Sequence, residues 1–297
     1  MNVEEREKSI EAGRIAREVV AYAREIVKPG ALLFEIAEKI DVKIAELGAK
    51  PAFPVNLSID EVAAHSTPAP ESGEIARGLL KVDIGIQIDG YVADTAFSVD
   101  LENSEENRRL ISAAEEALRH ALNTIGYGIR IRDVGLAIQN AIIKEGFSPV
   151  QNLSGHEIKR YDLHAGLNIP NYDNGSSFTL DEGVYAVEPF ATNGNGKVRD
   201  GKPSGIYQLS GSGNVRDNFA REVLAFIDSE YRGLPFCVRW IVKKFGSRGL
   251  LALRQMEQAG LLHQYPQLVE VSGGKVAQAE HTVLIREGEK IVTSLGS

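Results

Sequence analysis

The sequence predicts a mixed α/β domain that consists of two similar halves. Two observations lead to this fold class. Segments with helical spacing of apolar residues alternate with short apolar segments typical of strands, and the same order of elements occurs twice along the chain. Of the 297 residues, 43% are hydrophobic and 25% are charged, so the chain can bury the core that such a domain needs.

The first half contains two helices followed by a pair of strands. Apolar residues recur with helical spacing over residues 4–27, and Lys28-Pro29-Gly30 ends this helix. A second amphipathic helix is predicted over residues 32–47. Residues 51–56 form a loop or a short strand, and residues 79–99 have the apolar character of two strands.

The second half begins with two more helices, over residues 105–125 and 132–145. Residues 30–51 and 128–149 share the order glycine, helix, glycine, proline. The alternative to duplication is chance, because many helices end in glycine and are followed by proline. If the duplication is real, the two halves face each other across a central crevice, which is a natural place for a site.

Composition changes after Phe190. The segment from Thr192 to Ser212 is rich in Gly, Asn and Ser, which is typical of a linker or a hairpin. Helical segments at residues 218–228, 237–245 and 248–258 precede a small hairpin predicted within residues 261–271. We therefore expect a catalytic domain of residues 1–193 and 272–297, with a small winged-helix-like helical subdomain inserted at 194–271, called the insert below.

Charge and cysteine content narrow the classes of function. The net charge is −8, so we expect no direct nucleic-acid binding. The single cysteine, Cys237, allows no disulfide within the chain, and its apolar neighbours indicate a small buried residue. No apolar run reaches the roughly 20 residues of a membrane span, and residues 1–6 lack a signal core. We expect a cytoplasmic protein without membrane contact, and a monomer.

The segment from Lys81 to Asp94 carries the first chemical signal. Asp89-Gly90 between alternating apolar residues predicts a two-residue hairpin turn. Pairing outwards from this turn places Gly85 opposite Asp94, with Asp83 as a diagonal neighbour on the same face. Two close carboxylates repel each other unless a cation or a proton lies between them. A solvated sheet face is the alternative, but the apolar flanking residues favour a metal site.

Three further polar residues lie in apolar segments and complete a possible ligand set. His156 follows Gly155, Glu188 lies within the apolar residues 183–190, and Glu280 lies within residues 277–280. A carboxylate inside an apolar strand is costly to bury unless it is paired or bound to metal. Two Asp, one His and two Glu suit two divalent ions. Co, Mn, Fe and Zn all fit, and the sequence does not choose among them.

In this order, the motifs resemble those of the type 2 methionine aminopeptidases, in the pita-bread metallopeptidase family. The motifs are Ala52-Phe53-Pro54, Ala63-Ala64-His65, the hairpin from Asp83 to Asp94, Gly155-His156, His164-Ala165-Gly166, Val187-Glu188-Pro189-Phe190 and Ala277-Gln278-Ala279-Glu280-His281-Thr282. The resemblance implies two duplicated halves related by a pseudo-two-fold axis around a central antiparallel sheet. The insert is the type 2 hallmark, and the absence of a lysine-rich N-terminal extension resembles the short archaeal form.

The resemblance also implies roles for individual residues. The metal ligands would be Asp83, Asp94, His156, Glu188 and Glu280, with Asp94 and Glu280 bridging two ions. A water or hydroxide bridging the metals would attack the first peptide carbonyl, with Glu188 as general base and acid. His65 and His164 would hold the substrate and stabilise the oxyanion. Phe53, Pro54 and Leu163 would line the methionine pocket, and a small second residue would be preferred.

Other functions stay open at this point. A proline-directed aminopeptidase of the same fold is the runner-up, although such enzymes carry a large N-terminal domain that would precede Asp83. A non-catalytic binding protein on this fold would be expected to have lost metal ligands, and all five candidates are present here. The expected partners are the N-termini of nascent polypeptides, and ribosome docking would suit an enzyme that acts on them.

Overall fold

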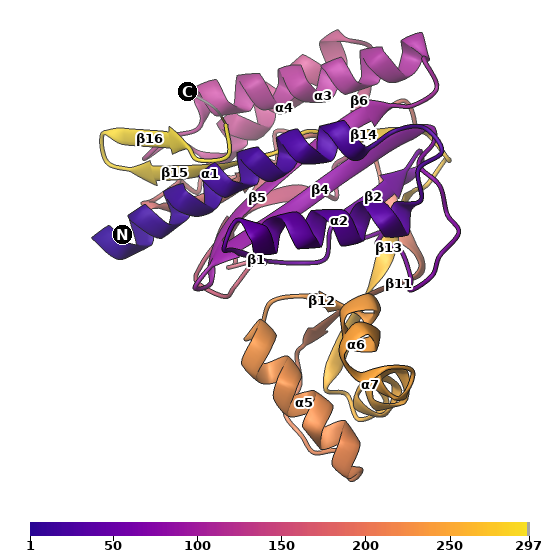
Figure 1. The fold of residues 1–297 in the computed structure, drawn as a ribbon. Coiled ribbons are helices and arrows are strands. Elements are labelled where there is room, and N and C mark those ends of the chain that lie inside the picture. Colours follow the sequence, from indigo (N-terminus) through magenta and orange to yellow (C-terminus); the bar gives the residue numbers. More distant parts are fainter. Residues whose placement is uncertain (296–297) are drawn as a thin grey trace.

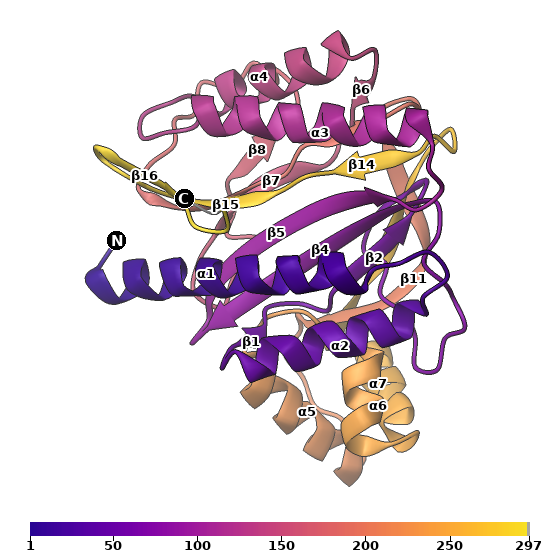
Figure 2. The ribbon, with the colours of Figure 1, turned by 45° about the horizontal axis from the view of Figure 1, so that its top comes forward.

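Two pairs of helices cover two halves of the molecule in the computed structural model, which describes residues 1–295. The helices α1 and α2 lie over one set of strands, and α3 and α4 lie over another, with the strands between them (Figure 2). The first half consists of α1 (Val3–Ile26), α2 (Leu33–Glu46), β1 (Lys50–Pro51), β2 (Asn56–Ile59), β3 (Val62–Ala64), β4 (Leu79–Ile88) and β5 (Tyr91–Asp100).

The second half repeats this order and is closed by strands from the end of the chain. It contains α3 (Glu105–Thr124), α4 (Ile131–Lys144), β6 (Ser148–Pro149), β7 (Ser154–Ile158), β8 (Asn168–Pro170), β9 (Gly183–Val187), β10 (Phe190–Thr192), β14 (Val276–Gln278), β15 (His281–Arg286) and β16 (Glu289–Val292). In the first half, β4 pairs antiparallel with β1, β2 and β5. In the second, the antiparallel order is β16-β15-β9-β7-β8.

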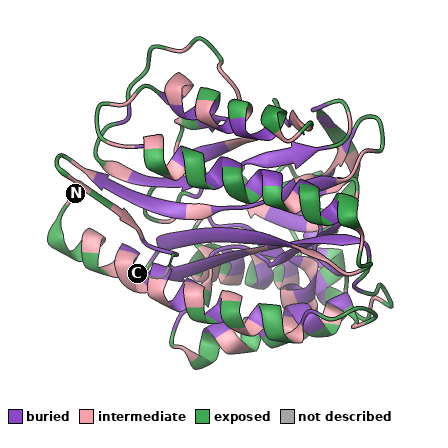
Figure 3. Cartoon of the chain, turned by 90° about the horizontal axis from the view of Figure 1, so that it is seen from above, coloured by how far each residue is buried: buried purple, intermediate pink, exposed green. Residues whose placement is uncertain are grey.

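The four long helices form because each presents one apolar face to the strands. Their inner faces are buried and their outer faces are exposed (Figure 3). The side chain of Asn2 caps α1 by accepting a hydrogen bond from the backbone N–H of Glu5, and Ser104 caps α3 in the same way through Asn107. The predicted helices are thus confirmed to within a few residues at each end.

The duplication extends to matching contacts. Residue Leu32, before α2, forms a bridge with Ile75, and residue Arg130, before α4, forms a bridge with Thr179. Each half also has its own apolar core, one made by α1, α2 and the strands β2, β4 and β5, the other by α3, α4 and strands of the second half. The mixed α/β fold with two similar halves and antiparallel sheets is confirmed.

The hairpin of β4 and β5 has the register that the sequence predicts. Gly85 pairs with Asp94, Asp83 with Ala96 and Ile88 with Tyr91. The face that carries Val82, Ile84 and Ile86 packs into the first apolar core. The face that carries the two aspartates therefore points toward the second half.

The two halves meet through β5 and the segment that joins β14 to β15. Backbone atoms of Ala96 and Glu280 form a bridge, with the Glu280 N–H donating to the Ala96 carbonyl at 3.0 Å. The Thr282 hydroxyl accepts from the Asp94 N–H at 2.7 Å and donates to the Asp94 carbonyl at 2.8 Å. These contacts fix Asp94 and Glu280 beside each other.

The segment after Phe190 differs from the expectation at both of its ends. The residues expected to form a linker or hairpin form a long strand, β11 (Val198–Leu209), and the expected hairpin within 261–271 is instead one strand, β13 (Leu262–Glu270). β11 and β13 pair with each other. Irregularities in their register lie around Pro203, where proline and glycine are compatible with a strand because the regular ladder is interrupted.

Between these strands lie α5 (Asn218–Tyr231), β12 (Phe236–Cys237), α6 (Val238–Phe245) and α7 (Arg248–Gln258). The three helices form a group of their own below the helix-covered halves (Figure 1), and α6 contacts α2 through ion pairs of Arg239 with Glu38 and Asp41. They share an apolar core of their own with one end of β11 and β13. The other end of β13 pairs with β3 of the first half. Within residues 1–295, no helix is long and apolar enough to cross a membrane.

The strands β7 and β9 approach each other so closely beside His156 that only glycine fits at position 155. A Cβ atom at this position would collide with the carbonyl oxygen of Ala186 and lie 3.3 Å from the Cα of Val187. We expect Gly155→Ala to lower the free energy of unfolding by about 1–3 kcal/mol, because backbone must move to admit the methyl group. Urea unfolding measures this effect. At Gly73, a Cβ meets nothing within 4 Å, so the control Gly73→Ala should stay within about 0.5 kcal/mol of the native chain; equal losses in both variants would contradict the packing argument.

Candidate metal centre

The first half contributes two carboxylates to one cavity. Asp83 and Asp94 project from β4 and β5 on the face that points away from the first apolar core. The aromatic ring of Phe53 occupies the space where a Cβ of Gly85 would lie. Glycine at position 85 therefore lets the Phe53 ring pack against the strand directly opposite Asp94.

The second half contributes three more polar side chains to the same cavity. His156 lies on β7, where it pairs with Ala186 of β9. Glu188 follows the last residue of β9, and Glu280 lies between β14 and β15. All five residues singled out from the sequence as metal ligands line a cavity of about 220 Å³.

The distances within this group are short. His156 Nε2 lies 3.6 Å from Asp94 Oδ2 and 3.7 Å from Glu188 Oε1. Asp94, His156 and Glu280 each offer a ligand atom within 4.8 Å of the other two. The amide of Gln278 lies 3.5 Å from both Glu188 Oε2 and Glu280 Oε2. A divalent ion could therefore contact several of these atoms at once.

Buried atoms without partners indicate that the cluster is suited to cations. Asp83 Oδ1, Asp94 Oδ1 and Glu280 Oε1 are buried and accept no hydrogen bond from the described residues. A buried carboxylate oxygen without a donor is costly unless a cation contacts it. Four carboxyl groups and one imidazole are also the donor types that divalent transition metals accept. The residues present thus fit a metal centre.

The pKa values of the four carboxyl groups and of His156 also indicate a site suited to cations. Burial raises the pKa of Asp83 to about 7. Burial, followed by repulsion from neighbouring carboxylates, holds the pKa of Asp94, Glu188 and Glu280 well above their usual ranges. Burial also lowers the pKa of His156 to about 3, so its imidazole is neutral and has a free lone pair at neutral pH. Each shift expresses the cost of burying charge without a counterion.

Two further histidines lie on the cavity wall. His65 has a positive φ of 57° and its Nδ1 lies 3.3 Å from the carbonyl oxygen of Pro266. Burial lowers its pKa to about 4, so the ring is neutral. The His164 ring lies 4.4 Å from that of His156, centroid to centroid. The structure thus brings both histidines to the cavity that holds the carboxylates.

The residues expected to line a methionine pocket divide into two groups. Phe53 and Leu163 line the cavity and are almost completely buried. Pro54 is not among the described residues that line it, and its carbonyl oxygen accepts a hydrogen bond from the side-chain amide of Asn56 at 2.9 Å. The role of Pro54 as a wall of the methionine pocket stays a prediction.

Several residues that line the cavity were not predicted from the sequence. Four polar ones, Asn56, Asn152, Ser154 and Asn168, come from segments near the recognised motifs. Four others come from the insert: Ile206, Pro235, Tyr265 and Leu268. No local pattern marks these last four, because the insert reaches the cavity through contacts between remote segments, such as the pairing of β13 with β3 and the hydrogen bonds between Val198 of β11 and Asn152. For the four polar residues, the sequence offered one signal, which is the repeat of Asn56-Leu57-Ser58 as Asn152-Leu153-Ser154.

Comparisons with known proteins agree with this site. The sequence profile of metallopeptidase family M24 matches residues 7–287. The chain is 47% identical over 300 residues to a methionine aminopeptidase of Thermococcus kodakarensis, covering 98% of this chain and 100% of the relative. Solved structures with the same fold include a methionine aminopeptidase from Thermotoga maritima (TM-score 0.72, 22% identity, 100% of this chain and 98% of that chain) and a thermophilic Arx1 (TM-score 0.83, 15% identity, 100% and 92%).

The raised carboxyl pKa values predict how pH acts on the metal-free chain. Asp83 titrates at about 7 in the folded state against an ordinary value of 3.8, so the folded state binds more protons than the unfolded state. Its contribution to stability is present below the unfolded pKa and is lost as pH rises through about 7. We expect the thermal unfolding midpoint of chelator-treated protein to decrease as the pH is raised from about 5.5 to about 8. Added Mn²⁺ should raise this midpoint more at the higher pH than at the lower pH.

The variant Asp83→Asn separates this effect from general alkaline sensitivity. It removes one of the buried charges, so its metal-free form should lose less stability over the same pH interval. A metal-free protein whose midpoint does not change over that interval, or an equal fall in both proteins, would contradict this reading of the carboxyl cluster. Scanning calorimetry on both proteins supplies the measurement.

Proposed function

The chain belongs to metallopeptidase family M24, and on this basis we infer that it is a methionine aminopeptidase, which hydrolyses the peptide bond after an N-terminal methionine. This inference rests on the sequence identity of 47% to a methionine aminopeptidase over nearly the full length of both chains. The cavity supports it, because the five candidate ligands and two histidines lie together on its wall. Its substrates would be the N-termini of nascent proteins and peptides.

We assign the chain to the type 2 class because of the insert at residues 194–271, between Glu188 and Glu280. In this division, residues 1–193 and 272–297 form the catalytic domain and the insert forms a helical subdomain. The separate apolar core of α5, α6 and α7 supports the division. The presence of Ile206, Pro235 and Tyr265 on the cavity wall gives the insert a part in shaping the site.

The metal centre would be held by Asp83, Asp94, His156, Glu188 and Glu280, with Asp94 and Glu280 shared between two ions. Their central positions support the sharing, since both are almost completely buried and their chain segments are hydrogen-bonded to each other. Divalent cations bound there supply Lewis acidity, which polarises the peptide carbonyl and lowers the pKa of an attacking water. Co, Mn, Fe and Zn are all compatible with the donor set.

Glu188 is the proposed proton carrier. Three carboxyl side chains lie near His156, those of Asp94, Glu188 and Glu280. Glu188 is the most accessible of them, with 14% of its side chain exposed. In this role the carboxylate takes a proton from the attacking water and releases it to the nitrogen of the leaving amine.

The two histidines are proposed to have different roles. Pro266 offers His65 only a carbonyl oxygen, which accepts hydrogen bonds, so Nδ1 of the neutral His65 ring carries the proton. Its Nε2 is then an acceptor and suits a backbone N–H of the substrate. His164, which is exposed beside His156, is left as the donor for the developing oxyanion.

The methionine side chain is proposed to lie against Phe53 and Leu163. Both belong to an apolar cluster at the edge of the cavity, so they can exclude water from a thioether chain. The second residue of the substrate is proposed to be small, because a bulky one would clash near the metal ligands. We further propose a cytoplasmic monomer, with ribosome docking as an additional association.

A peptide assay tests the proposed function. Metal-stripped protein reloaded with Mn²⁺ or Co²⁺ should release methionine from Met-Ala-Ser but not from Met-Leu-Ser, and it should leave Ala-Pro-Ala intact. Asp94→Ala and Glu280→Ala should abolish release, because each removes a shared ligand from a buried cluster. Cleavage of Ala-Pro-Ala alone would indicate the proline-directed runner-up, and a folded protein inactive with every metal would indicate a binding protein.

His164→Ala tests the oxyanion role separately. We expect kcat to fall by about 10²-fold or more, because a donor to the transition state is lost. Metal content, measured by atomic absorption, should stay unchanged, since His164 is outside the proposed ligand set. His65→Ala serves as the comparison and should raise KM for longer peptides. An unchanged kcat in His164→Ala would remove this residue from the proposed mechanism.

A further inference from the structure

The loop of residues 159–166, called the His164 loop below, provides two walls of the catalytic cavity. Leu163 and His164 line the cavity, whereas Tyr161 is not among the described residues that line it. The backbone of Tyr161 has a positive φ of 58°, which is uncommon for a bulky side chain and persists only where the surroundings hold it. No proposed catalytic or binding role uses Tyr161, and its contacts indicate what holds this loop in place.

The turn between β4 and β5 contacts Tyr161 from the first half of the molecule. The Tyr161 N–H donates to the carbonyl of Gly90 at 2.9 Å. A Cβ atom at Gly90 would collide with the Tyr161 ring, so glycine at this position lets the ring pack directly on the turn. The Nε of Arg160 donates to the carbonyl of Asp89 at 2.9 Å. Two successive residues of the His164 loop are thus hydrogen-bonded to the two residues of this turn.

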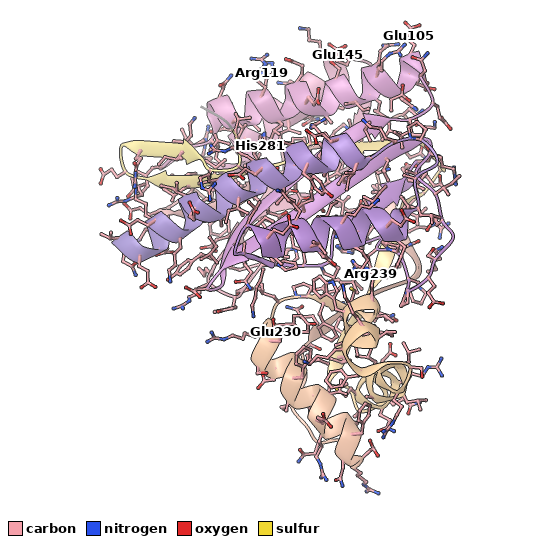
Figure 4. The ribbon with its side chains drawn as sticks, viewed as in Figure 1. Glu105, Arg119, Glu145, Glu230, Arg239 and His281 are labelled. Atoms are coloured by element: carbon pink, nitrogen blue, oxygen red, sulfur yellow. The ribbon has the colours of Figure 1, made fainter. Side chains whose placement is uncertain are left out.

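Arg232, at the end of α5, contacts the same ring from the insert. Its guanidinium carbon lies 4.2 Å from the centre of the Tyr161 ring, and its Nη1 donates to the Tyr161 hydroxyl at 2.9 Å. A guanidinium over an aromatic face is attracted by the electrons of the ring. Glu230, two residues earlier, pairs with Lys50 of the first half at 2.7 Å. Glu230 and Arg239 lie on the side of the insert nearest the first half (Figure 4), so the end of α5 is held there by ion pairs.

The chain that follows Arg232 leads from Tyr161 to the cavity. Arg232 adopts the left-handed conformation, with φ of 51°, which turns the chain at the end of α5. Leu234 is buried in the apolar cluster that contains Leu163, and Tyr161 packs against this cluster. Pro235 then lines the catalytic cavity. Residues 232–235 of the insert therefore lie along the His164 loop from the surface to the cavity wall.

We propose that Tyr161 is a positioning residue, which together with Arg232 of the insert holds the His164 loop and so sets the places of Leu163 and His164 in the cavity. Leu163 is a proposed wall for the methionine side chain, and His164 is the proposed oxyanion donor. Displacement of the loop should therefore reduce both the preference for methionine and the rate. The effect on catalysis rests on the proposed methionine aminopeptidase function, whereas the effect on the loop does not. Arg232 is exposed, so water weakens its contact and the expected changes are moderate.

The variant Arg232→Asn tests the contact between the insert and the loop. Asparagine tolerates the left-handed conformation, so the end of α5 should keep its fold, but its side chain is too short to cover the Tyr161 ring. The substrates are Met-Ala-Ser and the same peptide beginning with norvaline, whose side chain is one atom shorter. We expect the ratio of their kcat/KM values to fall by about three- to tenfold. A variant that only lowers the folded fraction leaves this ratio unchanged, because both substrates lose equally.

Amide hydrogen exchange of the Mn²⁺-loaded protein, followed by mass spectrometry, measures the loop independently of activity. Exchange over residues 159–166 should be about three- to tenfold faster in Arg232→Asn than in the native protein, because the loop opens more often. Tyr161→Phe is the second variant. It keeps the ring but loses the hydroxyl that accepts from Arg232, so it should show the same changes to a smaller extent. The matched control is Arg248→Asn, which loses a guanidinium 4.1 Å from the Phe219 ring inside the insert and should behave like the native protein.

Equal exchange of residues 159–166 in the native protein and in Arg232→Asn would overturn the proposal. Faster exchange with an unchanged substrate ratio would overturn it too, because the loop would then move without altering the methionine pocket. A native protein that releases methionine with no metal would contradict the proposed function. The exchange measurement alone would then support or overturn the role of Tyr161 in holding the loop.

Discussion

The burial of four carboxyl groups and one imidazole in a single cavity is the constraint on which the rest of this structure depends. Asp83, Asp94, Glu188 and Glu280 cannot all be charged at this spacing without a counterion, because moving each charge out of water costs several kcal/mol. Their raised pKa values and unpaired oxygens express that cost. Divalent cations bound there would offset this cost, so metal binding and local stability would depend on the same atoms.

The duplicated architecture explains how such a cluster can be held. Each half buries its own apolar core beneath two helices, and these two cores stabilise the chain independently of the polar crevice between them. The aspartates come from one half and the remaining ligands from the other, and paired backbone bonds between β5 and the segment at Glu280 fix their separation. The insert then adds a wall through Ile206 and Tyr265, so the shape of the cavity also depends on how β11 and β13 are placed.

Local sequence signals were sufficient to predict the structure where residues close in sequence are also close in space. The Asp89-Gly90 turn determines the pairing of Gly85 with Asp94, since a two-residue hairpin has only one register that buries its apolar face. The same reasoning failed for β11 and β13. Their partners lie more than fifty residues apart, and the glycine- and proline-rich sequence of β11 resembles a linker until its pairing with β13 is known. The cavity residues Ile206, Tyr265 and Leu268 were missed for the same reason, because they lie on these two strands.

The sequence by itself determined the helices, the hairpin register, the duplicated order of elements and the identity of the five candidate ligands, because each depends on periodicity, turn chemistry or a polar residue inside an apolar strand. Only the tertiary structure decided which of those residues approach each other, which tautomer Pro266 imposes on His65 and where the insert meets the catalytic cavity. It alone showed that Arg239 of α6 pairs with Glu38 and Asp41 of α2. The physical reason is that burial and distance between remote segments arise from packing, which no local pattern contains.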